Sequence, residues 1–373
     1  MAFSLIRTSV YLSSMMVGVG LLGWGQNWEA SSPARVAFRD SRVLAQSAPA
    51  INRDPVFYPT SPPPPGKDLP PAQRQRQESE TLGKDYRVSA LQPDFKGHLW
   101  VGSWQGLAKI DPNTGRIFGR ISLPNLAIGA LTQDLSGRVW VGTYEGLIRV
   151  DPRTNEITAQ TLALPSKRVL SLLVDRRGYL WVGGDGGLSL ISPDMGLLMT
   201  TLQDLPGVSV NAMTLDTTGQ LWVGTLEGLV QVDTASAMVK NRIEDLPGVS
   251  VQALTLDARG ALWVGTPNGL LEVDAITGQI LRSVTQLKGR NVTSLRFDKA
   301  GNFWVGTKNG LLRLNPYNGA IVSQVENLPS SRILSIAPDT GNKLWVGTSE
   351  GLAWISSSTG LVRPHATFSR MPR

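Results

Sequence analysis

The residues best suited to recognition chemistry lie in short loops that recur along the chain. Each loop follows a Trp-Val-Gly segment and precedes a Gly-Leu or Gly-Leu-like segment, and its tip varies from copy to copy. The tips read SWQ (103–105), TYE (143–145), GDG (184–186), TLE (225–227), TPN (266–268), TKN (307–309) and TSE (348–350). A shared frame with variable tips suits a binding surface, although plain solvent exposure would allow the same variation.

Two of these tips carry large aromatic side chains. Trp104 and Tyr144 occupy a position where other tips place Leu, Pro, Lys or Ser. Exposed aromatic rings can stack on sugar rings or contact a protein partner. The polar residues of the tips complete the predicted binding face: Glu145, Asp185, Glu227, Asn268, Lys308, Asn309 and Glu350.

Signatures of catalysis are missing from the sequence. It has no Cys, which excludes thiol nucleophiles, disulfides and thiolate metal sites. It has no Gly-x-Ser-x-Gly, phosphate-loop or His-Glu-x-x-His motif. Two histidines, His98 and His365, are too few for a His-based metal centre, and turns such as DPNTG (111–115) lack the carboxylate spacing of a calcium loop. We therefore predict no catalytic residue, no metal and no cofactor.

The charge of the chain also limits the classes of partner that it could bind. Lys and Arg number 36 and Asp and Glu 29, which gives a net charge of +7 on 373 residues. The excess is spread out, and no basic run is interleaved with aromatic residues as in a nucleic-acid binder. We therefore expect no nucleic-acid partner.

The loops recur because the whole chain is repetitive. The Trp of each Trp-Val-Gly segment stands at 100, 140, 181, 222, 263, 304 and 345, with spacings of 40 and then 41 residues. Within one unit, four short segments alternate apolar and polar residues, as β-strands do. In the third unit they are RVLSLLVD (168–175), YLWVGG (179–184), GLSLIS (187–192) and GLLMTTL (196–202).

A four-stranded sheet of this size cannot bury both of its faces alone. Seven such sheets can do so if they pack around an axis, and a period of 40–45 residues is typical of a β-propeller blade. We therefore predict an all-β, seven-bladed β-propeller of four-stranded antiparallel blades over residues 87–373. An open solenoid is the alternative. The recurring Trp is interpreted as core packing between blades.

Cationic residues stand just before the innermost strand of several units. Arg87, Arg168 and Arg332 occupy this position, and Arg290 lies one residue further out. In a propeller these side chains would rim the upper mouth of the central channel and favour an anionic group. An ordinary solvated surface is the alternative interpretation.

The unit VLSLLVDRRGYLWVGGDGGLSLISPDMG and its copies resemble the two-component regulator propeller repeat, from about Arg87 to Leu361. The resemblance implies the fold of a periplasmic sensor head. Family members of the hybrid-kinase type continue into a β-sandwich, a membrane span and kinase domains, whereas this chain ends at Arg373. We therefore expect a free-standing propeller.

A more distant similarity links the repeats to streptogramin lyases, which are also seven-bladed. That resemblance implies catalytic histidines and a divalent metal. His98 and His365 do not stand in neighbouring loops with an acidic partner, so a metal-dependent lyase is retained only as an alternative.

The N-terminal part reads as a targeting segment and a spacer. Residues 1–45 contain an apolar run from Thr8 to Trp24, as in a signal peptide or signal anchor. Residues 46–86 include a four-Pro run and are interpreted as a Pro-rich disordered linker. The fourth strand of the last blade could come from 74–82 or from LVRPHATF (361–368), and we favour 74–82 because Pro364 disfavours a strand.

These observations predict an exported, non-enzymatic propeller, periplasmic or secreted, that binds a protein or glycan partner, including an anionic one. Membrane contact is expected only through an N-terminal anchor, and a monomer is favoured. Besides the lyase, a purely structural scaffold of the cell envelope is an alternative.

Overall fold

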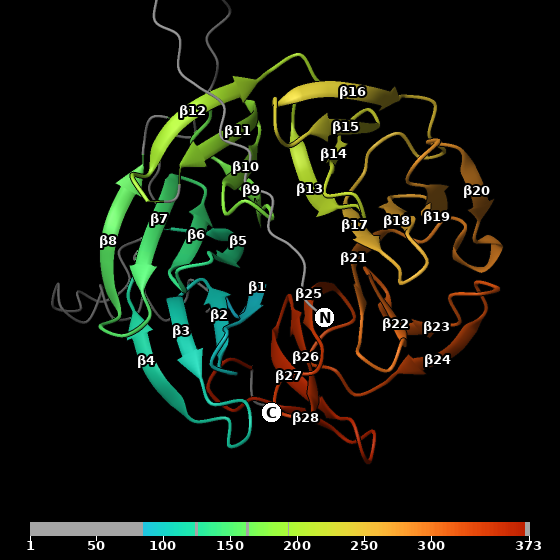
Figure 1. Ribbon diagram of the computed structural model, residues 1–373. Coiled ribbons are helices and arrows are strands. Elements are labelled where there is room, and N and C mark those ends of the chain that lie inside the picture. Colours follow the sequence, from blue (N-terminus) through green and yellow to red (C-terminus); the bar gives the residue numbers. More distant parts are fainter. Residues whose placement is uncertain (1–84, 124–125, 162–163, 193, 370–373) are drawn as a thin grey trace, which may run out of the picture. The chain divides into compact units, whose positions relative to one another are not determined.

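The computed structural model describes residues 85–123, 126–161, 164–192 and 194–369, which lie in the second of the two units of the chain, residues 70–373. Seven four-stranded antiparallel sheets surround a central axis (Figure 1). The prediction of a seven-bladed β-propeller is therefore confirmed. The predicted leader, 1–45, and nearly all of the predicted linker, 46–86, lie outside the described residues.

Each blade contributes four strands in chain order from the axis outward. The innermost strands are β1 (Val88–Pro93), β5 (Ile128–Gln133), β9 (Val169–Val174), β13 (Val210–Leu215), β17 (Ala253–Leu256), β21 (Val292–Phe297) and β25 (Ile333–Ala337). The second strands are β2 (Leu99–Ser103), β6 (Val139–Thr143), β10 (Leu180–Gly184), β14 (Leu221–Thr225), β18 (Ala261–Thr266), β22 (Phe303–Thr307) and β26 (Lys343–Thr348).

The outer half of each blade follows the same order. The third strands are β3 (Gly106–Ile110), β7 (Gly146–Asp151), β11 (Gly187–Ser192), β15 (Leu229–Asp233), β19 (Gly269–Asp274), β23 (Gly310–Leu314) and β27 (Gly351–Ser356). The outermost strands are β4 (Ile117–Ile121), β8 (Glu156–Thr161), β12 (Leu197–Leu202), β16 (Met238–Ile243), β20 (Ile280–Ser283), β24 (Ile321–Val325) and β28 (Val362–Pro364). A single turn of 3-10 helix, η1 (Thr285–Leu287), precedes the sixth blade. No helix of the described residues is long and apolar enough to cross a membrane.

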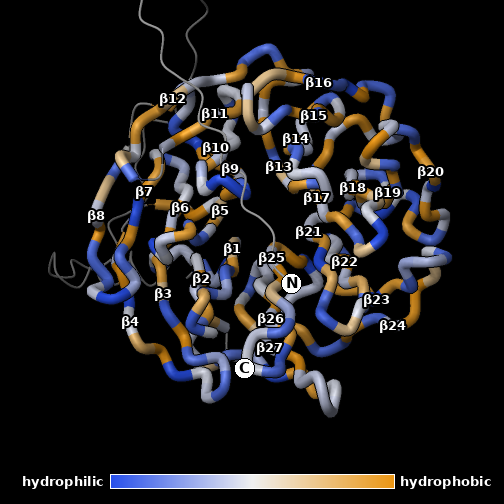
Figure 2. Tube along the Cα trace, in the orientation of Figure 1, coloured by the Kyte–Doolittle hydropathy of each residue, from blue (hydrophilic) through white to orange (hydrophobic). Residues whose placement is uncertain are grey.

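The core lies between the blades, where apolar strand segments face one another (Figure 2). Six of the seven recurring Trp side chains are at most 1% exposed, and Trp304 is partly buried against the seventh blade. Trp is the largest side chain available for such packing, and truncating a buried one to Ala typically costs about 3–5 kcal/mol. The interpretation of these indoles as core residues is therefore confirmed.

The turn between the first and second strands does more than reverse the chain. In the second blade, Asp134 Oδ1 accepts hydrogen bonds from the backbone N–H groups of Ser136 and Arg138, both at 3.0 Å. Its Oδ2 accepts one from the indole of Trp140 at 2.9 Å. The same Asp-to-indole bond recurs in three further blades, with Trp181, Trp263 and Trp304 as donors. One carboxylate thus organises the turn and the core Trp together.

The ring closes through the C-terminal segment. In the seventh blade, β28 pairs with β27, and Pro364 lies opposite Ala353. The expectation that residues 74–82 supply this strand is therefore wrong. Because β28 is an edge strand, the missing N–H of Pro364 costs no ladder bond, and the next residue, His365, still donates its N–H to Leu352 O at 2.8 Å.

Candidate functional site

The loops between the second and third strands share one backbone support. In the second blade, Thr143 Oγ1 donates to Gly146 O at 2.9 Å and accepts from the N–H of Glu145 at 3.1 Å. The same pair of bonds recurs around Thr225, Thr266, Thr307 and Thr348. Since these hydroxyls hold the backbone of each tip, the tip side chains can vary without changing the loop.

A cavity of about 630 Å³ opens on this face where the first, second and seventh blades meet. Its walls include Arg87, Trp104, Tyr144 and Arg332, four of the residues predicted as a binding site from the sequence. The same wall includes three residues that the sequence analysis did not predict: the polar Gln105 and Ser349 and the acidic Asp85. We refer to it as the rim cavity.

The two aromatic residues offer apolar surface to this cavity. Trp104 is 41% exposed and Tyr144 is 40% exposed, in contrast to the buried Trp residues of the core. The backbone N–H of Tyr144 donates to Ala127 O at 3.0 Å, which ties its loop to the segment that leads into β5. The rings are therefore presented by well-anchored backbone.

Charges around the rim cavity are partly paired. Arg87 Nε donates to Asp85 Oδ2 at 2.7 Å, so this guanidinium is largely balanced. Arg332 forms no ion pair with any residue that the structure describes. The rim cavity therefore carries one uncompensated cation, that of Arg332.

A third arginine stacks on the edge of the site. Arg168 Cζ lies 4.5 Å from the centre of the Tyr144 ring, and its Nη1 lies 3.6 Å from Asp185 Oδ2. The side-chain contact with Tyr144, followed by the charge of Asp185, raises the pKa of Arg168. This cation–π stack supports the orientation of the Tyr144 ring.

The other predicted residues do not line the rim cavity. The polar tip residues are all solvent-exposed, and they are Glu145, Asp185, Glu227, Asn268, Lys308, Asn309 and Glu350. Asn268, Lys308, Asn309 and Arg290 belong to the fifth and sixth blades. None of Arg87, Arg168, Arg290 and Arg332 lines the central channel, because the channel wall begins deeper, on the innermost strands.

Both histidines contact turns of the first blade. His98 Nδ1 lies 3.1 Å from Asp94 Oδ2 in the turn between β1 and β2. His365 Nε2 lies 2.8 Å from Gly115 O in the turn between β3 and β4. Burial lowers the pKa of His365. Within the described ranges, no group of three His, Cys, Asp or Glu residues is arranged to hold a metal ion.

Comparison with known families gives a match over five blades. Segments 163–186, 204–227, 245–268, 286–309 and 327–350 match the family described as two component regulator propeller. Each segment runs through the first and second strands and ends in the tip between the second and third strands. No curated protein matches the chain.

Solved structures share the fold at low sequence identity. The extracellular domain of a hybrid two component system from B. thetaiotaomicron is 21% identical with a TM-score of 0.62, covering 74% of this chain and 40% of that one. A catalytically inactive virginiamycin B lyase from Staphylococcus aureus with quinupristin is 18% identical with a TM-score of 0.63, covering 72% and 94%. A streptogramin B lyase is 15% identical with a TM-score of 0.62, covering 75% and 94%. This chain thus spans less than half of that extracellular domain.

Proposed function

We propose that this chain, five segments of which match the two component regulator propeller family, is an exported, non-catalytic binding module that recognises a glycan in the rim cavity. The extracellular origin of one structural neighbour supports a location outside the cytoplasm. The polar tips around the cavity supply the periphery of the contact surface.

The observation that carries the proposal is the convergence of Trp104 and Tyr144 in one cavity with polar side chains. A volume of about 630 Å³ lies in the range of small-ligand sites. Half-exposed aromatic faces suit the apolar faces of sugar rings, while Gln105 and Ser349 can bond to hydroxyls. The unpaired Arg332 favours a glycan that carries an acidic group.

A lyase reaction at the rim cavity has less support than glycan binding. His98 lies in the turn between β1 and β2, at the strand ends opposite to the loops of the rim cavity, because successive connections of an antiparallel blade alternate between its two ends. His365 follows β28 and contacts a turn of the first blade through Gly115 O. The similarity to streptogramin lyases therefore concerns the blades rather than an arrangement of histidines.

The proposal is tested with a glycan array probed with the full chain, followed by titration of the glycans that bind. Replacing Trp104 and Tyr144 with Ala should weaken binding at least roughly tenfold, as expected for aromatic hot spots. The matched control is Leu226→Ala, which truncates the equivalent, exposed tip residue of the fourth blade. Equal binding by the double variant and the wild type would refute the glycan site. If the chain bound a protein but no glycan, the partner would be a protein and the proposal of a glycan would be wrong.

A further inference from the structure

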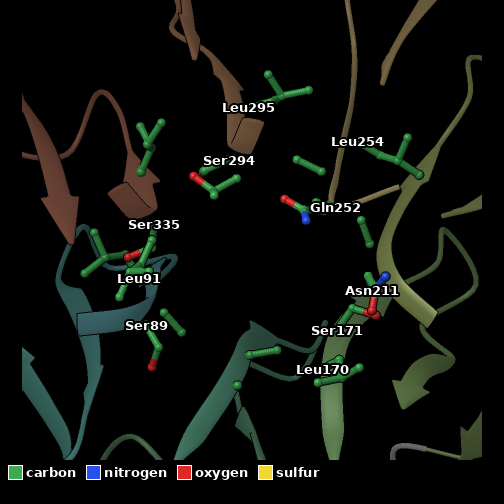
Figure 3. A pocket seen from close by; sticks show the side chains of 18 of the residues that line it. Ser89, Leu91, Leu170, Ser171, Asn211, Gln252, Leu254, Ser294, Leu295 and Ser335 are labelled. Atoms are coloured by element: carbon green, nitrogen blue, oxygen red, sulfur yellow. The ribbon is translucent and has the colours of Figure 1, made fainter. Parts of the chain in front are cut away.

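The central channel forms a second cavity, which adjoins the rim cavity at Ser89 and Leu334. It has a volume of about 290 Å³, and all seven innermost strands or the residues just before them contribute to its wall (Figure 3). Most lining residues are small or aliphatic. Its polar lining residues are Ser89, Ser171, Asn211, Gln252, Thr293, Ser294, Arg296 and Ser335.

Five of these polar side chains are already used to join neighbouring blades. Each donates a hydrogen bond to a backbone carbonyl at the start of the next innermost strand or, for Asn211, just before it. The pairs are Ser89 to Ile128, Ser171 to Val210, Asn211 to Val251, Thr293 to Ile333 and Ser335 to Val88. Gln252 and Ser294 have no side-chain hydrogen bond to any described residue, so their polar groups remain free for a ligand.

Among the residues that the structure describes, Arg296 is the only charged one on the channel wall. Its Nη1 donates to Leu295 O at 2.9 Å, and it forms no ion pair with the described part of the chain. The side chain keeps contact with solvent, although protein atoms surround it closely and this burial lowers the pKa of the guanidinium. Arginine nevertheless stays protonated under physiological conditions.

An uncompensated cation in a narrow, protein-walled cavity attracts anions strongly, since the low local polarisability of the walls strengthens its field. Ser294 and Arg296 are two residues apart on β21 and therefore project from the same face of that strand. Gln252, from the neighbouring fifth blade, lines the same cavity and offers an amide N–H₂ group (Figure 3).

We propose that the channel binds one small anionic group, a carboxylate or a phosphate, on Arg296, with Gln252 and Ser294 as hydrogen-bond partners. The group is held by the guanidinium fork, which matches both chemistries. The limited volume excludes a folded partner and admits a free anion or the anionic end of a slender ligand. This site does not depend on the function proposed for the rim cavity.

Isothermal titration calorimetry of the full chain tests the site, with inorganic phosphate, acetate and glucose 6-phosphate as probes at constant ionic strength set by chloride. We expect at least one probe to bind. Arg296→Met should weaken that binding roughly tenfold or more, since hydrogen bonds to charged groups are the strong ones. The comparison of inorganic phosphate with glucose 6-phosphate distinguishes a free anion from the end group of a larger ligand.

The matched control is Lys299→Met, which removes one positive charge from an exposed turn of the same blade and should leave binding unchanged. Gln252→Glu places a carboxylate in the cavity and should also weaken binding, which gives a second test if Arg296→Met fails to fold. The proposal is overturned if none of the probes binds, or if the probe that binds does so equally well to the Arg296→Met or Gln252→Glu protein. Since Trp104 and Tyr144 do not line the channel, their substitution should leave anion binding intact.

Discussion

At the scale of single residues, the blades differ in how they satisfy the indole N–H of the core Trp. Trp140 donates to Asp134, whereas the indole nitrogens of Trp100 and Trp222 have no hydrogen-bond partner in the described part of the chain. In the fourth blade, Gln231 Nε2 donates to Asp216 Oδ2 at 3.2 Å and takes the place of the indole. The same core residue therefore has a polar role in some blades and an apolar role in others.

This difference predicts unequal costs for the same substitution. Trp140→Phe removes a hydrogen bond to a buried carboxylate, while Trp222→Phe removes only packing, since both indoles are fully buried. We expect Trp140→Phe to lower the free energy of unfolding by about 1 kcal/mol more than Trp222→Phe. Urea denaturation of both variants measures the difference, and equal costs would show that the Asp–indole bond adds nothing to stability.

At the scale of elements, aspartates hold the turn between the third and fourth strands in four of the seven blades, with Asp111, Asp151, Asp233 and Asp274 accepting backbone hydrogen bonds. Asp151 accepts from both the side chain and the backbone of Arg153, and these bonds lower its pKa from 3.8 to about 2. Backbone hydrogen bonds from Thr277 and Ile276 lower the pKa of Asp274. The turns therefore depend on ionised carboxylates.

The lowered pKa values predict a loss of stability in acid. A carboxyl group whose folded pKa lies below its unfolded value stabilises the protein fully above the unfolded pKa, and this contribution is lost as the pH falls through the folded pKa. We expect the Tm to be constant near neutrality and to fall between about pH 4 and pH 2. Asp151→Asn should remove part of this dependence, and a variant with an unchanged acid slope would contradict the assignment. Calorimetric scans across this pH range provide the measurement.

At the scale of the whole molecule, the repeat period was enough to predict the number of blades, the strand order and the burial of the Trp residues. Trp104 and Tyr144 could be singled out because the repeat shows which residues are additions to a common frame. Their meeting with Arg332 could not be deduced, since it depends on the approach of the first and seventh blades across the ring closure. The sequence analysis did not single out Arg296 as a binding residue, because its position in the repeat does not indicate that its side chain faces the channel.

The hydrogen bond that closes the ring leads to a testable prediction about stability. Ser335 Oγ donates to Val88 O at 3.1 Å and joins the seventh blade to the first, whereas Ser294, at the same position of the sixth blade, has no such bond. Both serines are 8% exposed. Ser335→Ala should therefore cost about 1 kcal/mol more than Ser294→Ala. Guanidinium denaturation of the two variants provides the comparison, and a larger loss for Ser294→Ala would argue against a closing role for Ser335.

The central claim is that a partner binds on the rim where the first, second and seventh blades meet. Hydrogen–deuterium exchange of the full chain, with and without a glycan identified on the array, tests it most directly. The account predicts slower exchange in residues 102–106 and 142–146 and around Arg332, with the tips of the fourth to sixth blades unchanged. Protection confined to those distant tips, or to the turn beside His98, would contradict it.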